Sequence, residues 1–185
     1  MKFLIKKGSN SLNDALIEAC DDRSPNYELI QLLIMEGAIP DVIIRNRSVL
    51  YNAGKNANVE LMKVLIKLGS RDVQMGLFGA VNCIYNQDYF DYTEMDKDSS
   101  NKLLQDNHFM IKYFLDRGAR IDKNDSYWNH SPCYFACKNN NFENLKLLLE
   151  HENSFFDNPY LNKVISAQFE VENPSFEISK NFLEK

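Results

Sequence analysis

The sequence is short of basic charge and of long apolar runs, and each shortage excludes a class of protein. Its 185 residues carry 21 lysines and arginines against 26 aspartates and glutamates, so the net charge is −5 and the pI is near 5.3. Neutralising phosphates or anionic lipids needs a basic face, so neither nucleic acid nor a membrane surface is an expected partner. No run of about 18 apolar residues is present, which excludes a transmembrane helix.

Cysteine is also scarce, and a secretory leader is not evident. The opening "MKFLIKKGSN" places only three apolar residues between lysines, too few for the core of a signal peptide. Four cysteines in a chain of this size, without such a signal, indicate reduced thiols. We therefore expect one cytoplasmic domain that is long enough to bury a sizeable core.

A short motif that ends in glycine recurs along the chain. It reads "LIKKGS" at 4–9, "LIMEGA" at 33–38, "LIKLGS" at 65–70 and "FLDRGA" at 114–119, with a weaker "LLEHEN" at 148–153. Successive copies are 29, 32, 49 and 34 residues apart. The sequence therefore indicates units of about thirty residues, one of them lengthened by an insertion.

A second motif precedes every glycine motif except the first, and pairs a large apolar residue with an alanine three residues later. Its copies are "ALIEAC" at 15–20, "VLYNAG" at 49–54, "GLFGAV" at 76–81 and "PCYFAC" at 132–137. Polar turns such as "KNAN" at 55–58 and "KNNN" at 138–141 separate the two motifs. Each unit is thus predicted to be two short helices joined by a turn, and helices this short are stable only when neighbouring units bury them.

These units resemble the ankyrin repeat, whose pattern is T-P-L-H-x-A-A, a short turn and a leucine-rich helix ending in G-A. The stretches "SVLYNAGKNANVELMKVLIKLGS" and "SPCYFACKNNNFENLKLLLEHEN" follow that pattern position by position. The resemblance implies an all-α solenoid of four to five repeats with short β-hairpin fingers. The units we expect are a partial 1–9, then 10–38, 39–70, 71–119 with an insertion at 85–105, 120–153, and a degenerate or capping 154–185.

The ends and connections of the units carry local signals. Ser131 followed by Pro132 is typical of a helix start, and each unit-ending glycine suits the left-handed residue that ends a helix. The distance from glycine to the next large apolar residue leaves room for full β-hairpin fingers at 39–47 and 120–130, and only for stubs elsewhere. The insertion 85–105 is interpreted either as a solvated loop or as a binding loop rich in tyrosine and acid.

Catalytic signatures are missing. The sequence has no G-x-S-x-G, no P-loop and no H-E-x-x-H. The thiols and imidazoles that could bind zinc or act as a nucleophile pair are Cys133, Cys137, His108, His130 and His151. Cys20 and Cys137, however, occupy equivalent slots in two repeats, which favours buried cysteine over a metal site. We expect no enzyme activity, no metal, no cofactor and no small-molecule substrate.

The resemblance implies a non-catalytic module that binds another protein. The residues expected to contact it are Arg45, Arg47, Tyr89, Phe90, Tyr92, Tyr127 and Trp128. The alternatives are that the arginines are simply solvated and that Trp128 packs beneath the second finger. Tyr51 and Tyr134 either fill space in their repeats, which is the favoured interpretation, or line the concave face.

Ankyrin arrays with irregular units like these occur in large DNA viruses, protists and intracellular bacteria. The resemblance therefore implies an adaptor, a scaffold or a host-directed effector that acts in the cytosol of a host cell. The alternative function is a targeting segment of a larger multidomain enzyme or effector.

Overall fold

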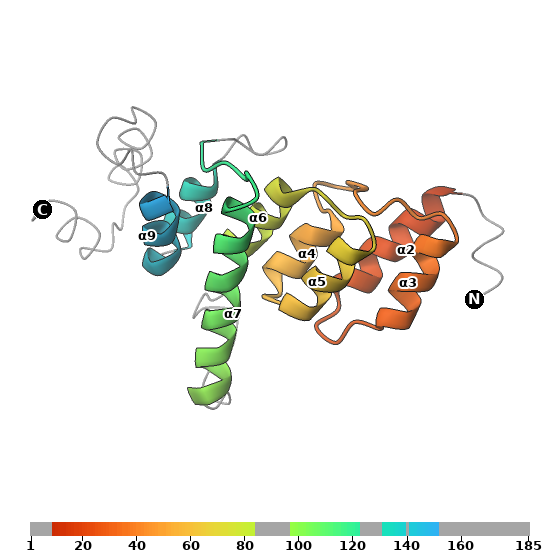
Figure 1. The fold of residues 1–185 in the computed structure, drawn as a ribbon, viewed down its shortest axis with the longest axis horizontal. Coiled ribbons are helices and arrows are strands. Elements are labelled where there is room, and N and C mark those ends of the chain that lie inside the picture. Colours follow the sequence, from red (N-terminus) through yellow and green to blue (C-terminus); the bar gives the residue numbers. More distant parts are fainter. Residues whose placement is uncertain (1–8, 84–96, 123–130, 140, 152–185) are drawn as a thin grey trace, which may run out of the picture.

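A computed structural model of the chain describes residues 9–83, 97–122, 131–139 and 141–151, and these residues form eight α-helices and no β-strand (Figure 1). The helices are α2 (Ser9–Asp21), α3 (Tyr27–Met35), α4 (Val49–Lys55), α5 (Val59–Lys67), α6 (Val73–Val81), α7 (Lys97–Leu115), α8 (Pro132–Lys138) and α9 (Phe142–His151). The all-α class expected from the sequence is confirmed for this part of the chain.

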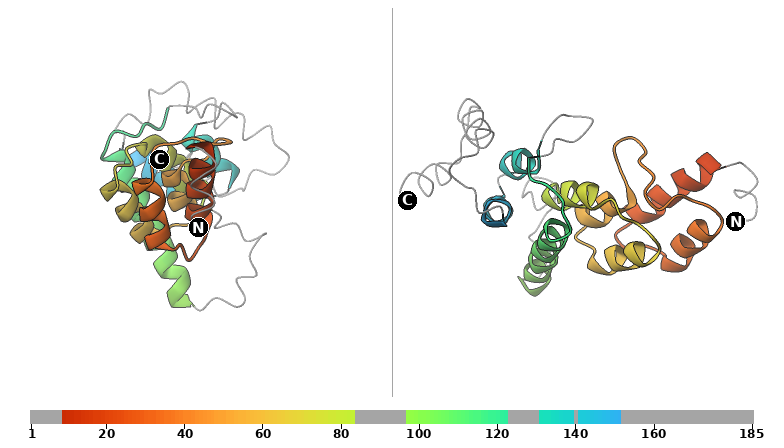
Figure 2. Two further views of the ribbon diagram at one scale, coloured as in Figure 1. Left: turned by 90° about the vertical axis from the view of Figure 1, so that its right-hand side faces the viewer. Right: turned by 45° about the horizontal axis from the view of Figure 1, so that its top comes forward.

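The helices pair in chain order, and the pairs follow one another in a row. α2 packs on α3, α4 on α5, α6 on α7 and α8 on α9. Between pairs, α4 lies between α2 and α6, and α6 contacts α8, while α7 contacts both α5 and α9. The described helices therefore form an elongated row, which Figure 1 and the right-hand view of Figure 2 show from the side and the left-hand view of Figure 2 shows end-on.

Short polar side chains begin most of these helices. At α3, α4, α5, α6 and α8 the residue before the helix accepts a hydrogen bond from the backbone N–H three residues later, and these residues are Asn26, Ser48, Asn58, Asp72 and Ser131. Each bond satisfies one of the N–H groups that a helix start leaves without a partner. The predicted start at Ser131–Pro132 is confirmed, with proline in the first turn.

The glycines that end the units adopt the expected left-handed backbone. Gly37, Gly69 and Gly118 have φ angles of 104°, 110° and 91° and follow α3, α5 and α7. At these positive φ angles a Cβ atom is sterically unfavourable, so glycine adopts the conformation with the smallest cost in free energy. Two further residues of the predicted series, Gly8 and Glu152, lie outside the described residues.

The closest approach in the row is between α4 and α6, where glycines face backbone. A Cβ atom added to Gly54 would lie 2.5 Å from the carbonyl oxygen of Gly76, and one added to Gly79 would overlap the backbone of Tyr51. Added to Gly76, it would lie 2.5 Å from the ring of Phe114. These glycines therefore let two helices and a core ring meet where alanine would not fit.

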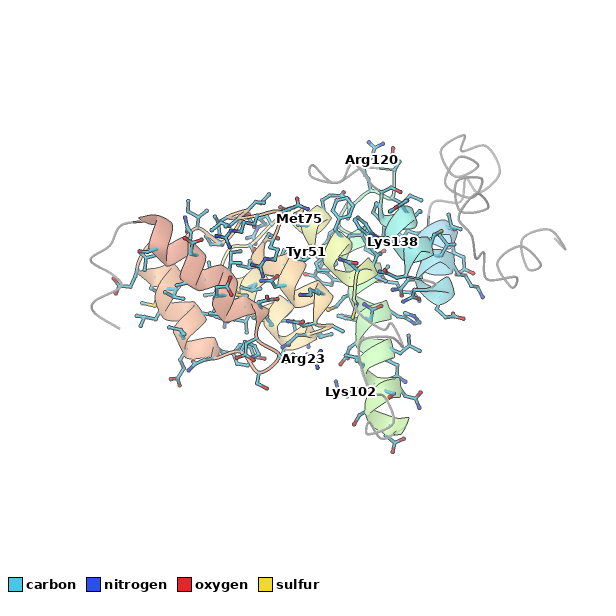
Figure 3. The ribbon with its side chains drawn as sticks, turned by 180° about the vertical axis from the view of Figure 1, so that it is seen from behind. Arg23, Tyr51, Met75, Lys102, Arg120 and Lys138 are labelled. Atoms are coloured by element: carbon cyan, nitrogen blue, oxygen red, sulfur yellow. The ribbon has the colours of Figure 1, made fainter. Side chains whose placement is uncertain are left out.

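The insertion expected at 85–105 is not a loop over its second half. Residues 97–105 are the first turns of α7, a continuous helix of 19 residues. Lys102, in this half, lies away from the rest of the row (Figure 3). The polar side chains here are compatible with an exposed helix, which the sequence interpretation did not consider. Residues 84–96 lie outside the described part of the chain.

The core runs the length of the row and includes all four cysteines. Cys20, Cys83, Cys133 and Cys137 are buried and unbridged. Burial raises the pKa of Cys20 and Cys83 to about 12 and that of Cys137 to about 11, because the thiolate is poorly solvated there. The interpretation of cysteine as a buried apolar residue is confirmed. Of the helices that the structure describes, none has the length and apolarity needed to cross a membrane.

Candidate functional site

The segment 39–47, between α3 and α4, was expected to form the first finger. Its tip is a tight turn in which Ile44 and Arg47 exchange two backbone hydrogen bonds, of 2.9 and 3.0 Å, across an antiparallel bridge. Arg45 and Asn46 lie between them with φ angles of 51° and 60°. Two consecutive left-handed residues are typical of the type I′ turn, which closes two-residue hairpins. The bridge is a single residue pair, so the longer hairpin predicted here is not shown.

Arg47 ties this tip to α2. Its guanidinium lies 2.8 Å from a carboxylate oxygen of Asp21 and 3.3 Å from one of Glu18. Lys55 of α4 lies 3.5 Å from the other oxygen of Asp21. Arg47 is thus held by two acids of the preceding unit, and it positions the tip instead of reaching outward from it.

Polar side chains also fix the base of the segment. The backbone N–H of Ile39 donates to Oδ1 of Asn13 at 2.8 Å. Oδ1 of Asp41 accepts from the hydroxyl of Ser70 at 2.9 Å and from the backbone N–H groups of Arg71 and Asp72 at 2.7 and 3.2 Å. The segment is therefore bonded to the unit on either side of it.

Three side chains of this anchored segment face solvent. Ile39 and Ile43 are 53 % and 52 % exposed, and Arg45 is exposed at the tip of the turn. A turn closed by the N–H of Val42 and the carbonyl of Ile39, 3.1 Å apart, directly precedes Ile43. We call Ile39, Ile43 and Arg45 the finger surface. The sequence interpretation named Arg45 and missed both isoleucines.

The other residues predicted to contact a partner are not placed. Tyr89, Phe90 and Tyr92, from the insertion, and Tyr127 and Trp128, from the second expected finger at 120–130, lie outside the described residues.

Tyr51 was expected to fill space in its repeat, and the structure confirms this. Its side chain is buried, and its hydroxyl accepts a hydrogen bond of 2.8 Å from the amide of Asn82. Tyr134, in the equivalent position of α8, packs partly buried against the core with its ring edge-on to Phe135. In Figure 3 the side chain of Tyr51 lies within the row, between α4 and α6. Neither tyrosine belongs to the finger surface.

The described residues that could act as ligands or nucleophiles are buried thiols, a partly buried imidazole and dispersed acids. Among them, no group of three or more histidine, cysteine or acidic side chains is arranged to hold a metal ion. The thiols of Cys20, Cys83 and Cys137 stay protonated at neutral pH, and a protonated thiol is a poor nucleophile. The pKa of His108 is lowered mainly by burial, with Glu143 raising it and Lys112 lowering it further. The feature of this part of the chain that is both exposed and held by hydrogen bonds is the finger surface.

Comparison with known proteins gives no relative from which to transfer a function. A scan against protein-family models finds no match. A search of curated proteins finds no related sequence either.

Proposed function

We propose that the chain is a non-catalytic module of the ankyrin type that binds another protein through the finger surface. The observation that carries this proposal is the anchored tip between α3 and α4. Two exposed isoleucines and an exposed arginine lie on a segment that is bonded to both neighbouring units, through the backbone of Ile39 and the side chain of Asp41. An ordered apolar and cationic surface loses little conformational entropy on binding, so its contacts contribute more fully to affinity.

The repeating architecture supports the ankyrin assignment. Short helices begin at Asn, Ser or Asp caps, the second helix of three successive units ends at a left-handed glycine, and each pair packs on the next. A row of this kind presents a long surface without any need for a catalytic centre. Its buried, unbridged cysteines are compatible with a reducing compartment, which supports our proposal of a cytoplasmic location.

A pull-down from eukaryotic cell lysate tests the proposal when it is run on a finger variant. The variant is Ile43→Ser with Arg45→Glu, which removes one apolar contact and reverses one charge. The control is Tyr27→Ser with Lys67→Glu, the same kinds of change at exposed positions of α3 and α5. We expect a protein that is retained by the natural chain and by the control, and that is lost by the finger variant.

The proposal fails if the finger variant retains every captured protein, or if the natural chain captures nothing. Both variants change only exposed side chains, so their thermal unfolding is expected to match that of the natural chain. If the finger variant has a lowered melting temperature, it is replaced by Arg45→Glu alone, which leaves both isoleucines in place.

A further inference from the structure

A second ordered surface lies on the exposed side of α7 and on the turn that follows it. Phe109 and Tyr113 are four residues apart and so share one face of the helix, and Arg117 follows in the turn after the helix ends at Leu115. The rings of Phe109 and Tyr113 are 6.1 Å apart between centroids, and the guanidinium of Arg117 lies 3.5 Å from the centroid of the Tyr113 ring. Phe109 is nonetheless 47 % exposed.

The stacked side chains of Phe109, Tyr113 and Arg117 are supported by the core. Tyr113 packs edge-on against the buried Phe114, with ring centroids 5.8 Å apart. The stacked guanidinium of Arg117 is therefore fixed over a ring that is itself fixed by the core. A preorganised arginine beside an exposed aromatic ring is the kind of group that contributes most to protein interfaces.

The charges around these three side chains leave a small positive excess. Asp106 is paired with Lys102. Asp116, just after the helix, lies 3.4 Å from His151 of α9, which carries charge only when protonated, so one carboxylate stands against the two cations Lys112 and Arg117. Lys112 and Arg117 are both exposed, and neither forms a salt bridge within the part of the chain that the structure describes. In a chain of net charge −5, two cations and one carboxylate leave a local excess of positive charge beside one exposed ring.

We infer that Phe109, Lys112, Tyr113 and Arg117 form a second docking surface, and that its occupant is an acidic peptide segment with an aromatic or large aliphatic anchor residue. The anchor covers Phe109, and flanking carboxylates pair with Lys112 and Arg117. The guanidinium presents its remaining N–H donors to a carboxylate, while stacking limits the entropy lost on binding. This surface belongs to α7 and the turn after it, whereas the finger surface belongs to the segment between α3 and α4. The inference does not depend on the finger surface.

An acidic peptide fits better than nucleic acid. Two cations beside an aromatic ring neutralise few phosphates, and the acidic chain as a whole would repel a polyanion. A short segment with one or two carboxylates meets the local charge without approaching the rest of the surface. Pairing of this kind also speeds the encounter and makes the affinity depend on salt.

Peptide display against the intact protein tests this inference. A library of random twelve-residue peptides is selected on the natural chain, and the enriched peptides are synthesised and measured by fluorescence polarisation. We expect net acidic peptides with an aromatic or large aliphatic residue. We also expect them to bind Phe109→Ser and Arg117→Glu at least about tenfold more weakly, the loss typical of a central interface residue.

Further variants separate this surface from the finger and from a loss of folding. Ile43→Ser with Arg45→Glu, the finger variant, is expected to bind the selected peptides as the natural chain does. Arg117→Lys keeps the charge but not the planar stacking, so its loss is expected to be smaller than that of Arg117→Glu. The helical circular dichroism of each variant is measured beside its affinity, so that a loss of binding is read only on a folded chain.

The inference is overturned if no peptide is enriched, if the enriched peptides are neutral or basic, or if Phe109→Ser binds them unchanged. It is also overturned if the finger variant abolishes binding while Phe109→Ser does not, and in that case the proposed function of the finger survives. Concentration-dependent self-association that Phe109→Ser removes would assign the face to a second copy of the chain, and would equally overturn it.

Discussion

At the scale of single residues, Gly79 is the position where the packing has least room. A Cβ atom there would overlap the backbone of Tyr51 in the facing helix α4. A flexible side chain can move aside, but a helical backbone cannot move without displacing its whole pair. We expect Gly79→Ala to lower the free energy of unfolding by about 3 kcal/mol or more, at the upper end of the usual cost of overpacking.

The matched control is Gly118→Ala. There the added Cβ atom would meet nothing within 4 Å, and the cost comes from the backbone, whose φ angle is 91°. Left-handed strain costs roughly 1–2 kcal/mol, partly offset because alanine restricts the unfolded chain. Urea denaturation followed by circular dichroism compares the two variants. A loss at Gly79 no larger than that at Gly118 would contradict the close approach of α4 and α6.

At the scale of elements, side chains bond the connections between units to one another. Asp41 receives three hydrogen bonds from the short connection between α5 and α6. Gln74, at the start of α6, exchanges two hydrogen bonds, of 3.0 and 2.9 Å, with the backbone of Arg120, which follows α7. These bonds hold successive connections together where no strand pairing is present among the described residues.

We expect Asp41→Ala to lower the free energy of unfolding by about 2–3 kcal/mol. The hydroxyl of Ser70, which is almost fully buried, would keep only the carbonyl of Pro40, and two backbone N–H groups would lose their acceptor. Asp41→Asn retains one acceptor oxygen, so its loss is expected to be smaller. The control Asp122→Ala removes an exposed acid paired with Arg120 and should change stability by less than about 0.5 kcal/mol. Equal losses for Asp41→Ala and Asp122→Ala would contradict the role assigned to Asp41.

Local signals in the sequence predicted the helix starts and ends, because caps and left-handed glycines act on residues close in the chain. Ser131, Gly37 and Gly69 are examples. Bonds such as that between Asp41 and Ser70 join residues 29 positions apart, and nothing in one sequence marks such a pair. The second half of the insertion was misinterpreted because its lysines and serines suit an exposed helix as well as a loop.

Less of the candidate site than of the fold could be predicted from the sequence. Arg45 was predicted because an arginine in an expected finger is a natural contact residue. Ile39 and Ile43 resemble the buried isoleucines of the helices in every local respect, so only the folded structure shows that they face solvent. Phe109 was missed for the same reason, since large apolar residues are usually core residues and this one lies next to the buried Met110.

At the scale of the whole molecule, stability should vary along the row. α4 and α6 have neighbouring pairs on both sides, and most of their side chains are buried. α3, at one end of the described row, exposes Tyr27 and Met35. Because each pair rests mainly on its neighbours, an end pair can open while the interior pairs stay folded.

We expect backbone amides of α4 and α6 to exchange with solvent deuterium more slowly than those of α3. Hydrogen exchange followed by mass spectrometry of peptic fragments measures this directly. The comparison uses only amides bonded within helices, so that exposed loop amides do not dominate it. Uniform exchange across α3, α4 and α6 would show that the row unfolds as one unit and would contradict the gradient.

The end-to-end arrangement of the pairs has a mechanical consequence. A pulling force applied at the two ends of the row acts on the junctions one after another, because no described pair bridges the whole length. The molecule would then extend in steps, and in each step one helix pair would unfold. The pairs would refold in the reverse order when the load is removed. The glycine-lined junction between α4 and α6, where the two backbones are in contact, would resist the applied force most.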